Sequence, residues 1–157
     1  MASEWSGLRH VVLLGMTDCI FCAIVAGSAP ARVVYSDEHL LGFLDIRPIT
    51  RGHTLLIPRA HSVGLADVHP DTGARLFSAA QDVAAAMKSS ELGADGVNLA
   101  LNDGRAAFQT VFHTHLHVLP RHHGDRLRFV RGLVVRRDPD PDATAQILRS
   151  ALPPTQS

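Results

Sequence analysis

Three histidines occupy alternate positions in the run HTHLHV at residues 113–118. Side chains of a β-strand alternate between its two faces, and each residue adds about 3.3 Å. His113, His115 and His117 are therefore expected on one face, with neighbours about 6.6 Å apart, while the residues between them turn into a core. Neutral imidazole acts near pH 7 as a nucleophile, a general base or a metal ligand. The spacing thus predicts a strand face that carries chemistry.

Other interpretations of this strand are a solvated edge with scattered histidines, a cupin-type metal site and a metallo-hydrolase site. A solvated edge gives no reason for three histidines in register. A cupin needs many short strands with glycine-rich turns, and the long helical pattern over residues 71–91 argues against it. A His-x-His-x-Asp-His metal site requires an acid at position 117, where this chain has His. There remains imidazole as a covalent nucleophile, for which phosphorus is the suitable electrophile because a phosphoramidate can itself be hydrolysed.

Such a nucleophile needs an acceptor for its second ring nitrogen and donors for the phosphate oxygens. The strand backbone offers carbonyl groups for the first requirement. Asn102, Gln109 and Thr110 lie shortly before the histidine strand. Their amide and hydroxyl groups are expected to lie over the near end of that strand.

Length and composition indicate one globular domain. The chain has 157 residues, 46% of them apolar and 19% charged, which suits a single core. The formal net charge is zero with neutral His, which argues against dependence on nucleic acid. The apolar run at residues 11–14 is too short for a signal peptide or a membrane span. We therefore expect a cytoplasmic protein with no membrane association and no disulfide scaffold.

We expect residues 1–17 to form a flexible extension, 18–152 a single domain and 153–157 a tail. Short turns between the predicted strands favour antiparallel pairing and an α+β fold. The predicted strands cover residues 31–36, 39–45, 53–57, 97–101 and 111–119, with a further short strand at 133–136. The predicted helices cover 18–26, 71–91 and 140–152.

The helix over 71–91 shows an apolar stripe with helical spacing. Asp71 or Asp67 is expected to cap its start, and Gly93 ends the run. Gly27 is expected to end the first helix, and Pro141 is expected in the first turn of the last helix. The stripe consists of Leu76, Ala80, Val83, Ala84 and Met87.

The run HTHLHVL at residues 113–119 resembles the His-φ-His-φ-His-φ-φ signature of the histidine triad superfamily of nucleotide hydrolases and transferases. Further segments are similar to family motifs in the family's order: IFCAI (20–24), FLDIRP (43–48), GHTLLIPRAH (52–61) and NDG (102–104). The resemblance covers roughly residues 18–121 and is strongest to bacterial members of the branch that cleaves adenosine phosphoramidates. It implies an antiparallel sheet of about five strands with flanking helices, and a homodimer in which two sheets join.

The resemblance also implies roles for individual residues. His115 is implied as the nucleophile, His117 as a contact to the α-phosphate, and His53 as the residue that orients the triad, with no catalytic cofactor. The other implied phosphate contacts are Asn102, Gln109 and Thr110, whose hydroxyl would help to protonate the leaving group. The chain departs from the pattern at Phe108, where relatives often have Gly, which puts the roles of Gln109 and Thr110 in question.

The nucleotide's sugar and base have implied partners as well. Asp45 matches the acid that holds the ribose hydroxyls. An apolar base pocket is implied for Phe21, Ile24, Phe43, Ile46 and Leu55. The competing interpretation of these five apolar residues is the hydrophobic core, and we expect it to hold for at least two of them.

The pair Cys19-x-x-Cys22 has three interpretations: two buried thiols, a redox pair, or half of a zinc site. No thioredoxin-like βαβ unit surrounds it, which argues against the redox pair. Some bacterial histidine triad proteins combine such cysteines with two histidines, which implies His61 and His113 as the other ligands. A site of four protein ligands is closed and therefore structural.

The arginine-rich stretch 121–137 is interpreted as a solvated face, with contact to a leaving group or to a dimer partner as the alternative. His122 and His123 are expected to be exposed loop residues. The expected activity is hydrolysis or transfer at the α-phosphate of a purine nucleotide through a nucleotidyl-histidine. The alternatives are a dinucleoside polyphosphate hydrolase and a nucleotide-binding regulatory protein without turnover.

Overall fold

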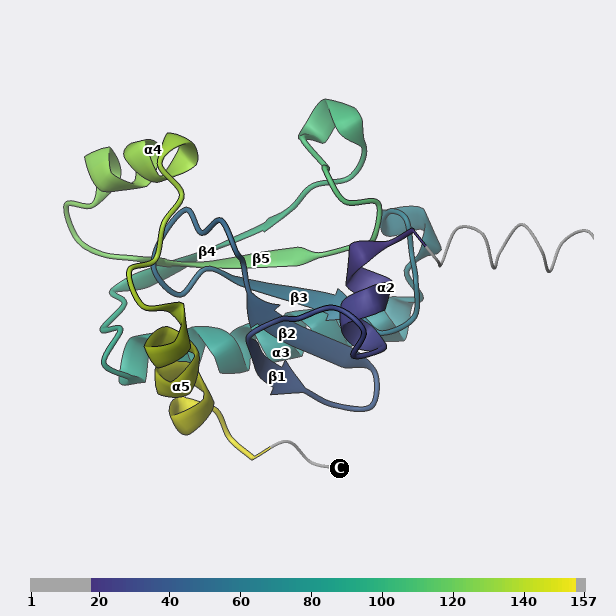
Figure 1. The fold of residues 1–157 in the computed structure, drawn as a ribbon, viewed down its shortest axis with the longest axis horizontal. Helices are drawn as coiled ribbons and strands as arrows, with labels where there is room; N and C mark the ends of the chain where they lie inside the picture. Colours follow the sequence, from purple (N-terminus) through teal and green to yellow (C-terminus); the bar gives the residue numbers. More distant parts are fainter. Residues whose placement is uncertain (1–17, 155–157) are drawn as a thin grey trace, which may run out of the picture.

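The computed structural model describes residues 18–154, so the expectations for residues 1–17 and for the last three residues of the tail lie outside the described part. The described chain forms the expected α+β fold around one antiparallel sheet with strand order β1-β2-β3-β5-β4 (Figure 1). The strands are β1 (Val33–Ser36), β2 (Leu40–Leu44), β3 (Thr54–Pro58), β4 (Gly96–Leu101) and β5 (Leu116–Arg121). Every neighbouring pair is antiparallel, as the short connections predict.

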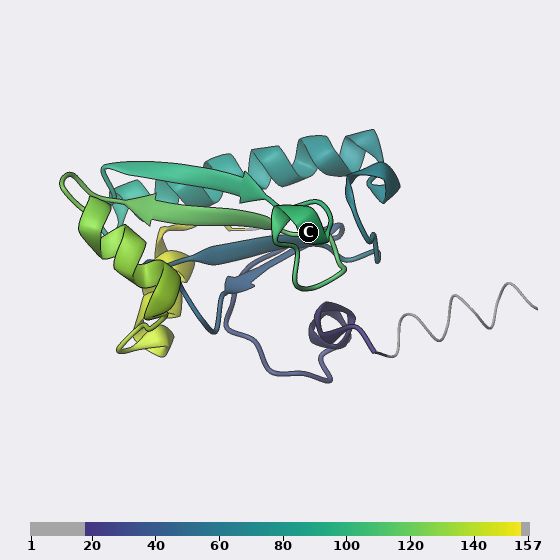
Figure 2. The ribbon, with the colours of Figure 1, turned by 90° about the horizontal axis from the view of Figure 1, so that it is seen from above.

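The two faces of the sheet are covered differently (Figure 2). The long helix α3 (Pro70–Ser89) lies along one face, and α5 (Pro141–Ala151) packs beside it. Their apolar side chains meet those of the sheet in the main core, which includes Leu56, Val83 and Leu148. No helix among residues 18–154 combines the length and the apolarity that crossing a membrane requires.

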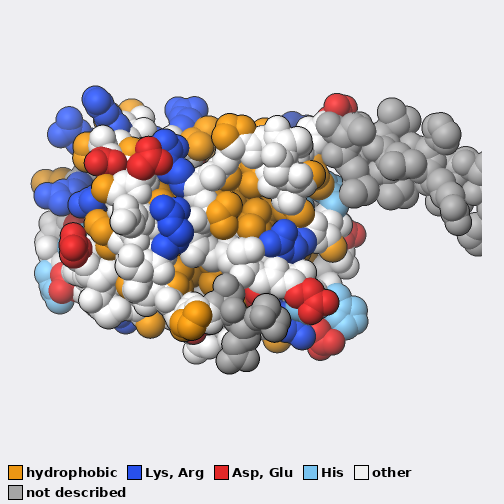
Figure 3. Space-filling model, turned by 60° about the horizontal axis from the view of Figure 1, so that its bottom comes forward, with side chains coloured by type: hydrophobic (Ala, Val, Ile, Leu, Met, Phe, Trp, Pro, Cys, Tyr) orange, Lys and Arg blue, Asp and Glu red, His pale blue; other side chains and the backbone are white. Residues whose placement is uncertain are grey.

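The opposite face carries the short helix α2 (Ile20–Val25) and a second, smaller core. Phe43, Leu55 and His117 occupy one cross-strand row on this face, since β2, β3 and β5 pair through these positions. Seen from this side, hydrophobic side chains gather in the middle of the molecule, and arginines gather at the edge that carries α4 (Arg126–Val134) (Figure 3). The histidine strand therefore belongs to the less covered face.

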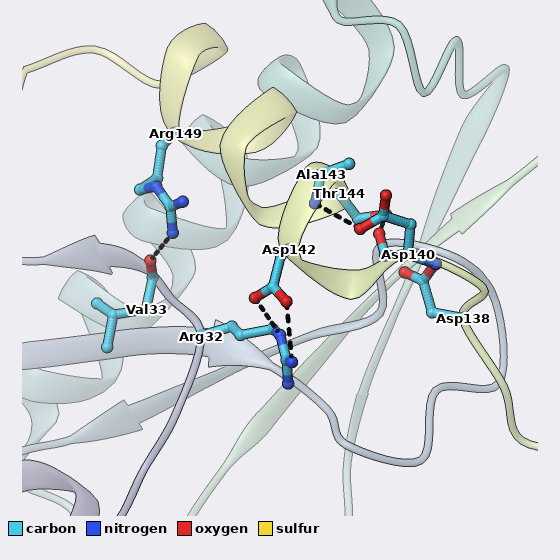
Figure 4. A network of polar contacts seen from close by, with 8 residues as sticks. All are labelled: Arg32, Val33, Asp138, Asp140, Asp142, Ala143, Thr144 and Arg149. Carbon is cyan, nitrogen blue, oxygen red and sulfur yellow. Dashed lines mark hydrogen bonds and ion pairs between the residues drawn. The ribbon is translucent and has the colours of Figure 1, made fainter.

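The β1 edge of the sheet is sealed by α5 (Figure 4). The Arg149 guanidinium donates to the backbone carbonyl of Val33 at 3.0 Å. Arg32 donates two hydrogen bonds to Asp142, at 2.7 and 3.2 Å. As expected, Pro141 lies in the first turn of α5, and Asp140 caps that helix by accepting from the Ala143 amide. At the other edge, β4 pairs only with β5 among the described residues.

The strand predicted over 111–119 is wrong at both of its ends. The regular strand β5 begins at Leu116, because the Thr114 amide donates to the Ser62 carbonyl at 2.6 Å rather than to β3. It also continues through Pro120 to Arg121. The ladder between β3 and β5 ends at the pair Thr54–Val118, so the missing N–H of Pro120 breaks no bond on that side.

The short strand predicted over 133–136 is also wrong. Residues 133 and 134 end α4, and residues 135 and 136 follow it in irregular structure. The valines there favour a strand only where neighbouring chains cover them. Val134 and Val135 are instead exposed, and Gly132 packs the helix directly onto the Ile49 carbonyl. Packing at that glycine outweighs the β-propensity.

The predicted cap of the long helix is wrong as well. The helix begins at Pro70, and the His69 side chain accepts a hydrogen bond from the Asp71 amide at 3.3 Å. Asp67 instead accepts from Val63 and Gly64 in the 3-10 turn Leu65–Asp67 before the helix. The predicted apolar stripe is buried except for Ala84, which is half-buried.

Candidate active site and metal centre

His115 lies in the irregular segment that leads into β5, with its ring edge against Phe21 of α2. Its Nδ1 donates to the backbone carbonyl of His113 at 2.7 Å. In a neutral imidazole the other nitrogen then carries the lone pair. The residue is 4% exposed; within residues 18–154 nothing hydrogen-bonds to its Nε2, and that atom is not fully buried. A neutral His115 thus presents an accessible nucleophilic nitrogen.

His117 is held by a short chain of hydrogen bonds that begins at the backbone. The Ile49 amide donates to Nδ1 of His53 at 3.2 Å. The proton of His53 must then be on Nε2, which lies 2.9 Å from Nδ1 of His117. The proton of His117 is consequently on Nε2, a buried atom to which the described part of the chain offers no hydrogen-bond partner. His117 therefore holds a free N–H donor beside His115, whose ring centroid is 4.9 Å away.

Burial keeps both His53 and His117 neutral. Burial lowers the pKa of His53 to about 3, with a further contribution from the positive charge of Arg136. Burial also lowers the pKa of His117 to about 4, with contributions from the neighbouring His53 and His115. At neutral pH these rings act as hydrogen-bonding groups and not as cations.

Asp45 lies beside this chain at the end of β2. Its Oδ1 accepts from the Arg47 amide at 2.8 Å, and its Oδ2 is 3.5 Å from Nδ1 of His53. Asp45, His53 and His117 have ligand atoms close enough for a metal. Both nitrogens of His53 are already engaged, however, Nδ1 by the Ile49 amide and Nε2 by His117, so the geometry favours a hydrogen-bonded chain.

The five residues predicted to line a base pocket do not share one environment. Phe21, Phe43 and Leu55 are buried together in the small core under α2, and Ile24 packs against them half-buried. Ile46 is 83% exposed on the loop after β2. As expected, at least two of these residues belong to a core.

The three predicted phosphate donors also differ. The Gln109 side chain is buried, and its Oε1 accepts from the Gly104 amide at 2.8 Å. Its Nε2 donates to the carbonyls of Val63 and Val111 at 2.7 and 3.1 Å. This amide holds the loop and has no donor left for phosphate. Asn102 is half-buried and Thr110 is exposed.

Phe108, next to Gln109, has an unusual backbone. It ends the 3-10 turn Arg105–Ala107 with φ +66°, and it is the only non-glycine residue with positive φ in the described chain. Its side chain is 84% exposed. The left-handed region favours glycine because it has no Cβ to clash with the backbone. The departure seen in the sequence is therefore a strained position in the structure.

A second cluster joins α2 to the start of the histidine segment. Ligand atoms of Cys19, Cys22, His61 and His113 all lie within 4.8 Å of one another. Cys22 Sγ lies 3.2 Å from Nδ1 of His61, and both sulfurs lie 3.6 Å from Nδ1 of His113. A tetrahedral zinc site with Zn–S near 2.3 Å and Zn–N near 2.0 Å separates sulfur from nitrogen by about 3.5 Å. The donor set and its spacing fit zinc.

The protonation of these side chains agrees with that fit. Nε2 of His113 donates to the Pro58 carbonyl at 2.8 Å, which leaves the lone pair on the nitrogen that faces the sulfurs. Burial and the adjacent Cys19 thiol raise the pKa of Cys22 to about 11. Two thiolates here would therefore need a cation beside them. His113 belongs to both clusters, since its carbonyl orients His115.

Two features of the site have no signal in the sequence. The Ile49 amide fixes the tautomer of His53, and any residue except proline supplies such a group. Arg136 lies in the irregular segment after α4, and its positive charge lowers the pKa of His53 and His117, but the arginine-rich stretch of the sequence does not single it out. Two surface hollows of about 300 and 640 Å³, beside β1 and between α3 and α5, contain no histidine or cysteine.

Comparison with known proteins places this site in a family. The HIT domain family matches residues 26–124. An uncharacterized HIT-like protein of Mycobacterium tuberculosis is 54% identical over 134 residues, which are 85% of this chain and 92% of that protein. A zinc-bound histidine triad family protein from Mycobacterium smegmatis has a TM-score of 0.80 and 54% identity, and the match covers 87% of this chain and 94% of that one. The adenylylsulfatase HINT3 of Arabidopsis thaliana is 38% identical over 110 residues, which are 70% of this chain and 55% of that protein.

The strand order, the four ordered imidazoles and these matches agree with one another. The chain belongs to the histidine triad (HIT) family, a superfamily of nucleotide-binding hydrolases and transferases.

Proposed function

We propose that this protein hydrolyses or transfers purine nucleoside monophosphates at the α-phosphorus through a covalent nucleotidyl-His115. The observation that supports this most directly is the bond from Nδ1 of His115 to the His113 carbonyl, which in the neutral ring leaves the lone pair on Nε2. The free Nε2–H of His117 is a suitable donor for a phosphate oxygen. Adenosine 5′-phosphoramidate is the reference substrate of the proposal.

The reaction has two steps. The Nε2 lone pair of His115 forms a bond to the α-phosphorus while the bond from phosphorus to the leaving group breaks. The leaving group departs with that electron pair and takes up a proton, assisted by the neighbouring imidazoles and the Thr110 hydroxyl. A water oxygen then attacks the phosphorus, the N–P bond breaks, the electron pair returns to Nε2, and the water proton passes to solvent.

The variant His115→Gln tests the nucleophile. We expect hydrolysis of adenosine 5′-phosphoramidate, followed by chromatography of AMP, to fall at least about a thousandfold. The matched control His122→Gln changes a histidine in the loop after β5 and should keep the wild-type rate. Trapping with radioactive substrate should label wild-type His115 through an acid-labile bond. Normal turnover by His115→Gln, or the absence of any label, contradicts the proposal.

The proposed chemistry allows several leaving groups. One relative is an adenylylsulfatase, which favours including adenosine 5′-phosphosulfate among the substrates to compare. Diadenosine tetraphosphate tests the neighbouring branch with the same nucleophile. Nucleotide binding without turnover of any of these compounds would indicate a regulatory module instead.

Two further proposals concern assembly and metal. Cys19, Cys22, His61 and His113 are proposed to hold a structural zinc ion, which supplies positive charge for two thiolates and ties α2 to the histidine segment. Two copies are proposed to join through β4, whose outer edge has no strand partner among residues 18–154. The cytoplasmic location stays a prediction from the sequence.

A further inference from the structure

The helix α4 and the residues directly after it carry positive charge that no described acid balances. Arg121 and Arg51 have carboxylate partners, Asp125 and Asp138. Within residues 18–154, no carboxylate lies within 4.0 Å of the guanidinium groups of Arg126, Arg128, Arg131, Arg136 and Arg137. Figure 3 shows basic side chains gathered toward one end of the molecule, with acidic side chains among them. Such a group attracts anions.

This basic segment is packed against the loop that carries His53. The Cα of Gly132 lies so close to the Ile49 carbonyl that a Cβ would collide with it. Ile49 is four residues before His53 in the sequence, and its amide donates a hydrogen bond to the His53 ring. Further along, Asp138 lies 4.0 Å from Arg51. Residues 132–138 therefore follow the loop between β2 and β3 past the site.

Arg136 lies in the middle of that stretch. Its Nε donates to the Leu133 carbonyl at 3.3 Å, and the side chain is exposed. Burial is the main cause of the low pKa of both His53 and His117, and the positive charge of Arg136 lowers each further. Because Gly132 packs on Ile49 and Asp138 lies 4.0 Å from Arg51, the intervening Arg136 lies beside the loop that carries His53. No described carboxylate pairs with its guanidinium, whose planar set of donors suits an oxyanion.

We propose that Arg136 forms a second anion-binding position beside the triad, which selects nucleotides with an anionic group besides the α-phosphate. This inference rests on the proposed function of the histidine site. The second anion has two possible sources: a sulfate or phosphate leaving group, or a phosphate on the ribose. Both present tetrahedral oxyanions to the guanidinium. The remaining α4 arginines are ordinary surface charges in this account.

Binding separates the two sources without requiring turnover. In the His115→Gln background, calorimetry compares AMP, adenosine 5′-phosphosulfate and adenosine 3′,5′-bisphosphate. We expect Arg136→Gln to reduce the preference for one of the two ligands that carry a second anionic group over AMP about tenfold to a hundredfold. Loss of the phosphosulfate preference identifies the leaving group as the source. Loss of the bisphosphate preference identifies the ribose phosphate.

Matched variants separate a specific contact from general surface charge. Arg136→Lys keeps the charge without the planar fork and should retain part of the preference. Arg128→Gln removes an equal charge elsewhere on α4 and should leave the preference intact. The inference is overturned if Arg136→Gln changes neither preference, or if Arg128→Gln produces the same loss.

Turnover supplies the second readout. With an active His115, Arg136→Gln should lower kcat/KM for adenosine 5′-phosphosulfate relative to adenosine 5′-phosphoramidate about tenfold, if the leaving group is the source. An inactive wild-type protein that still binds the bisphosphate through Arg136 would contradict the proposed reaction and uphold this inference. An active enzyme whose substrate preference does not change in Arg136→Gln would support the proposed reaction and contradict this inference.

Discussion

At the scale of the residue, the second nitrogen of each imidazole decides what the first can do. In His113 and His115 one nitrogen donates to a backbone carbonyl, so the other keeps its lone pair. The lone pair of His113 faces the cysteine sulfurs, and the lone pair of His115 is accessible. In His53 and His117 a donor occupies Nδ1, so the proton moves to Nε2. Similar side chains are thereby suited to the three roles proposed for them, metal ligand, nucleophile and donor.

The neutral pair of His53 and His117 predicts acid sensitivity. Both folded-state pKa values, about 3 and about 4, lie below the ordinary value of 6.5. Below about pH 6.5 the unfolded chain binds protons that the folded chain does not, so stability is complete above that pH and falls as the pH is lowered. At about pH 5 each histidine should cost about 2 kcal/mol, since one pKa unit corresponds to about 1.4 kcal/mol.

Urea unfolding at about pH 7.5 and pH 5 measures this loss, with EDTA present so that metal release does not contribute. The variant His53→Gln should lose less stability between the two pH values than the wild type. An equal loss in both proteins would show that acid acts elsewhere.

The strained backbone of Phe108 predicts a gain in stability on substitution. A left-handed residue with a Cβ costs about 1–2 kcal/mol, of which the greater unfolded-state freedom of glycine takes back about 0.5–1 kcal/mol. Phe108→Gly should therefore raise the free energy of unfolding by about 0.5–1 kcal/mol. Phe108→Ala keeps the strained Cβ and should bring no such gain. Equal values for Gly and Ala in denaturant titrations would exclude strain as the cause.

The alternation of residue types identified His113, His115 and His117, and the resemblance to the family added His53 and the grouping of Cys19 and Cys22 with His61 and His113 that the structure shows. Neither could assign their protons, because these depend on the carbonyls of Pro58 and His113 and on the Ile49 amide. The role of Gln109 could not be predicted for the same reason. Its side chain forms hydrogen bonds with three backbone groups, and no sequence pattern indicates them.

At the scale of the element, α2 is too short to be stable alone. It has six residues, of which only Phe21 is buried, and isolated helices below about 12 residues are marginal in water. Its attachment depends on the small core and on the cysteines at positions 19 and 22, which face His61 and His113.

Metal removal should therefore loosen α2. We expect about one zinc ion per chain by elemental analysis. A ligand present at a thousandfold excess over its Kd stabilises the folded state by about 4 kcal/mol, so EDTA should lower Tm and speed amide exchange over residues 20–25. Cys22→Ser should show the same exchange without EDTA and respond no further to it. A metal-free wild type that EDTA leaves unchanged would exclude this role for zinc.

Elements with a clear period were predictable and those set by distant packing were not. The pattern identifies α3 because its apolar stripe, from Leu76 to Met87, repeats over about three turns. The helix α4 buries only Gly132, which packs against Ile49, more than 80 residues earlier in the chain. The early start predicted for β5 failed because Ser62, and not β3, receives the Thr114 amide.

At the scale of the whole molecule, the two edges of the sheet differ. The β1 edge is engaged by Arg149 and covered by α5, whereas Asn98, Leu99 and Ala100 of β4 are exposed. An edge of this kind pairs readily with another strand. The proposed homodimer therefore uses β4.

Leu99→Asp tests this interface. Paired β4 strands related by a two-fold axis would bring two carboxylates close together in a partly apolar contact, which is unfavourable. We expect the dissociation constant to rise at least about tenfold, which corresponds to about 1.4 kcal/mol. Sedimentation measures it, and Val130→Asp on α4 is the control, since that side chain is also exposed. A wild-type protein with the mass of one chain would refute the pairing.

The closure of the β1 edge has a consequence for aggregation. An extended fibril grows only if each added molecule offers a fresh strand on its far side. Here that side is blocked by a guanidinium on a carbonyl and by a helix. After two molecules pair through their β4 edges, the covered β1 edges oppose the addition of a third. A sheet with a single open edge therefore favours a dimer over a fibril.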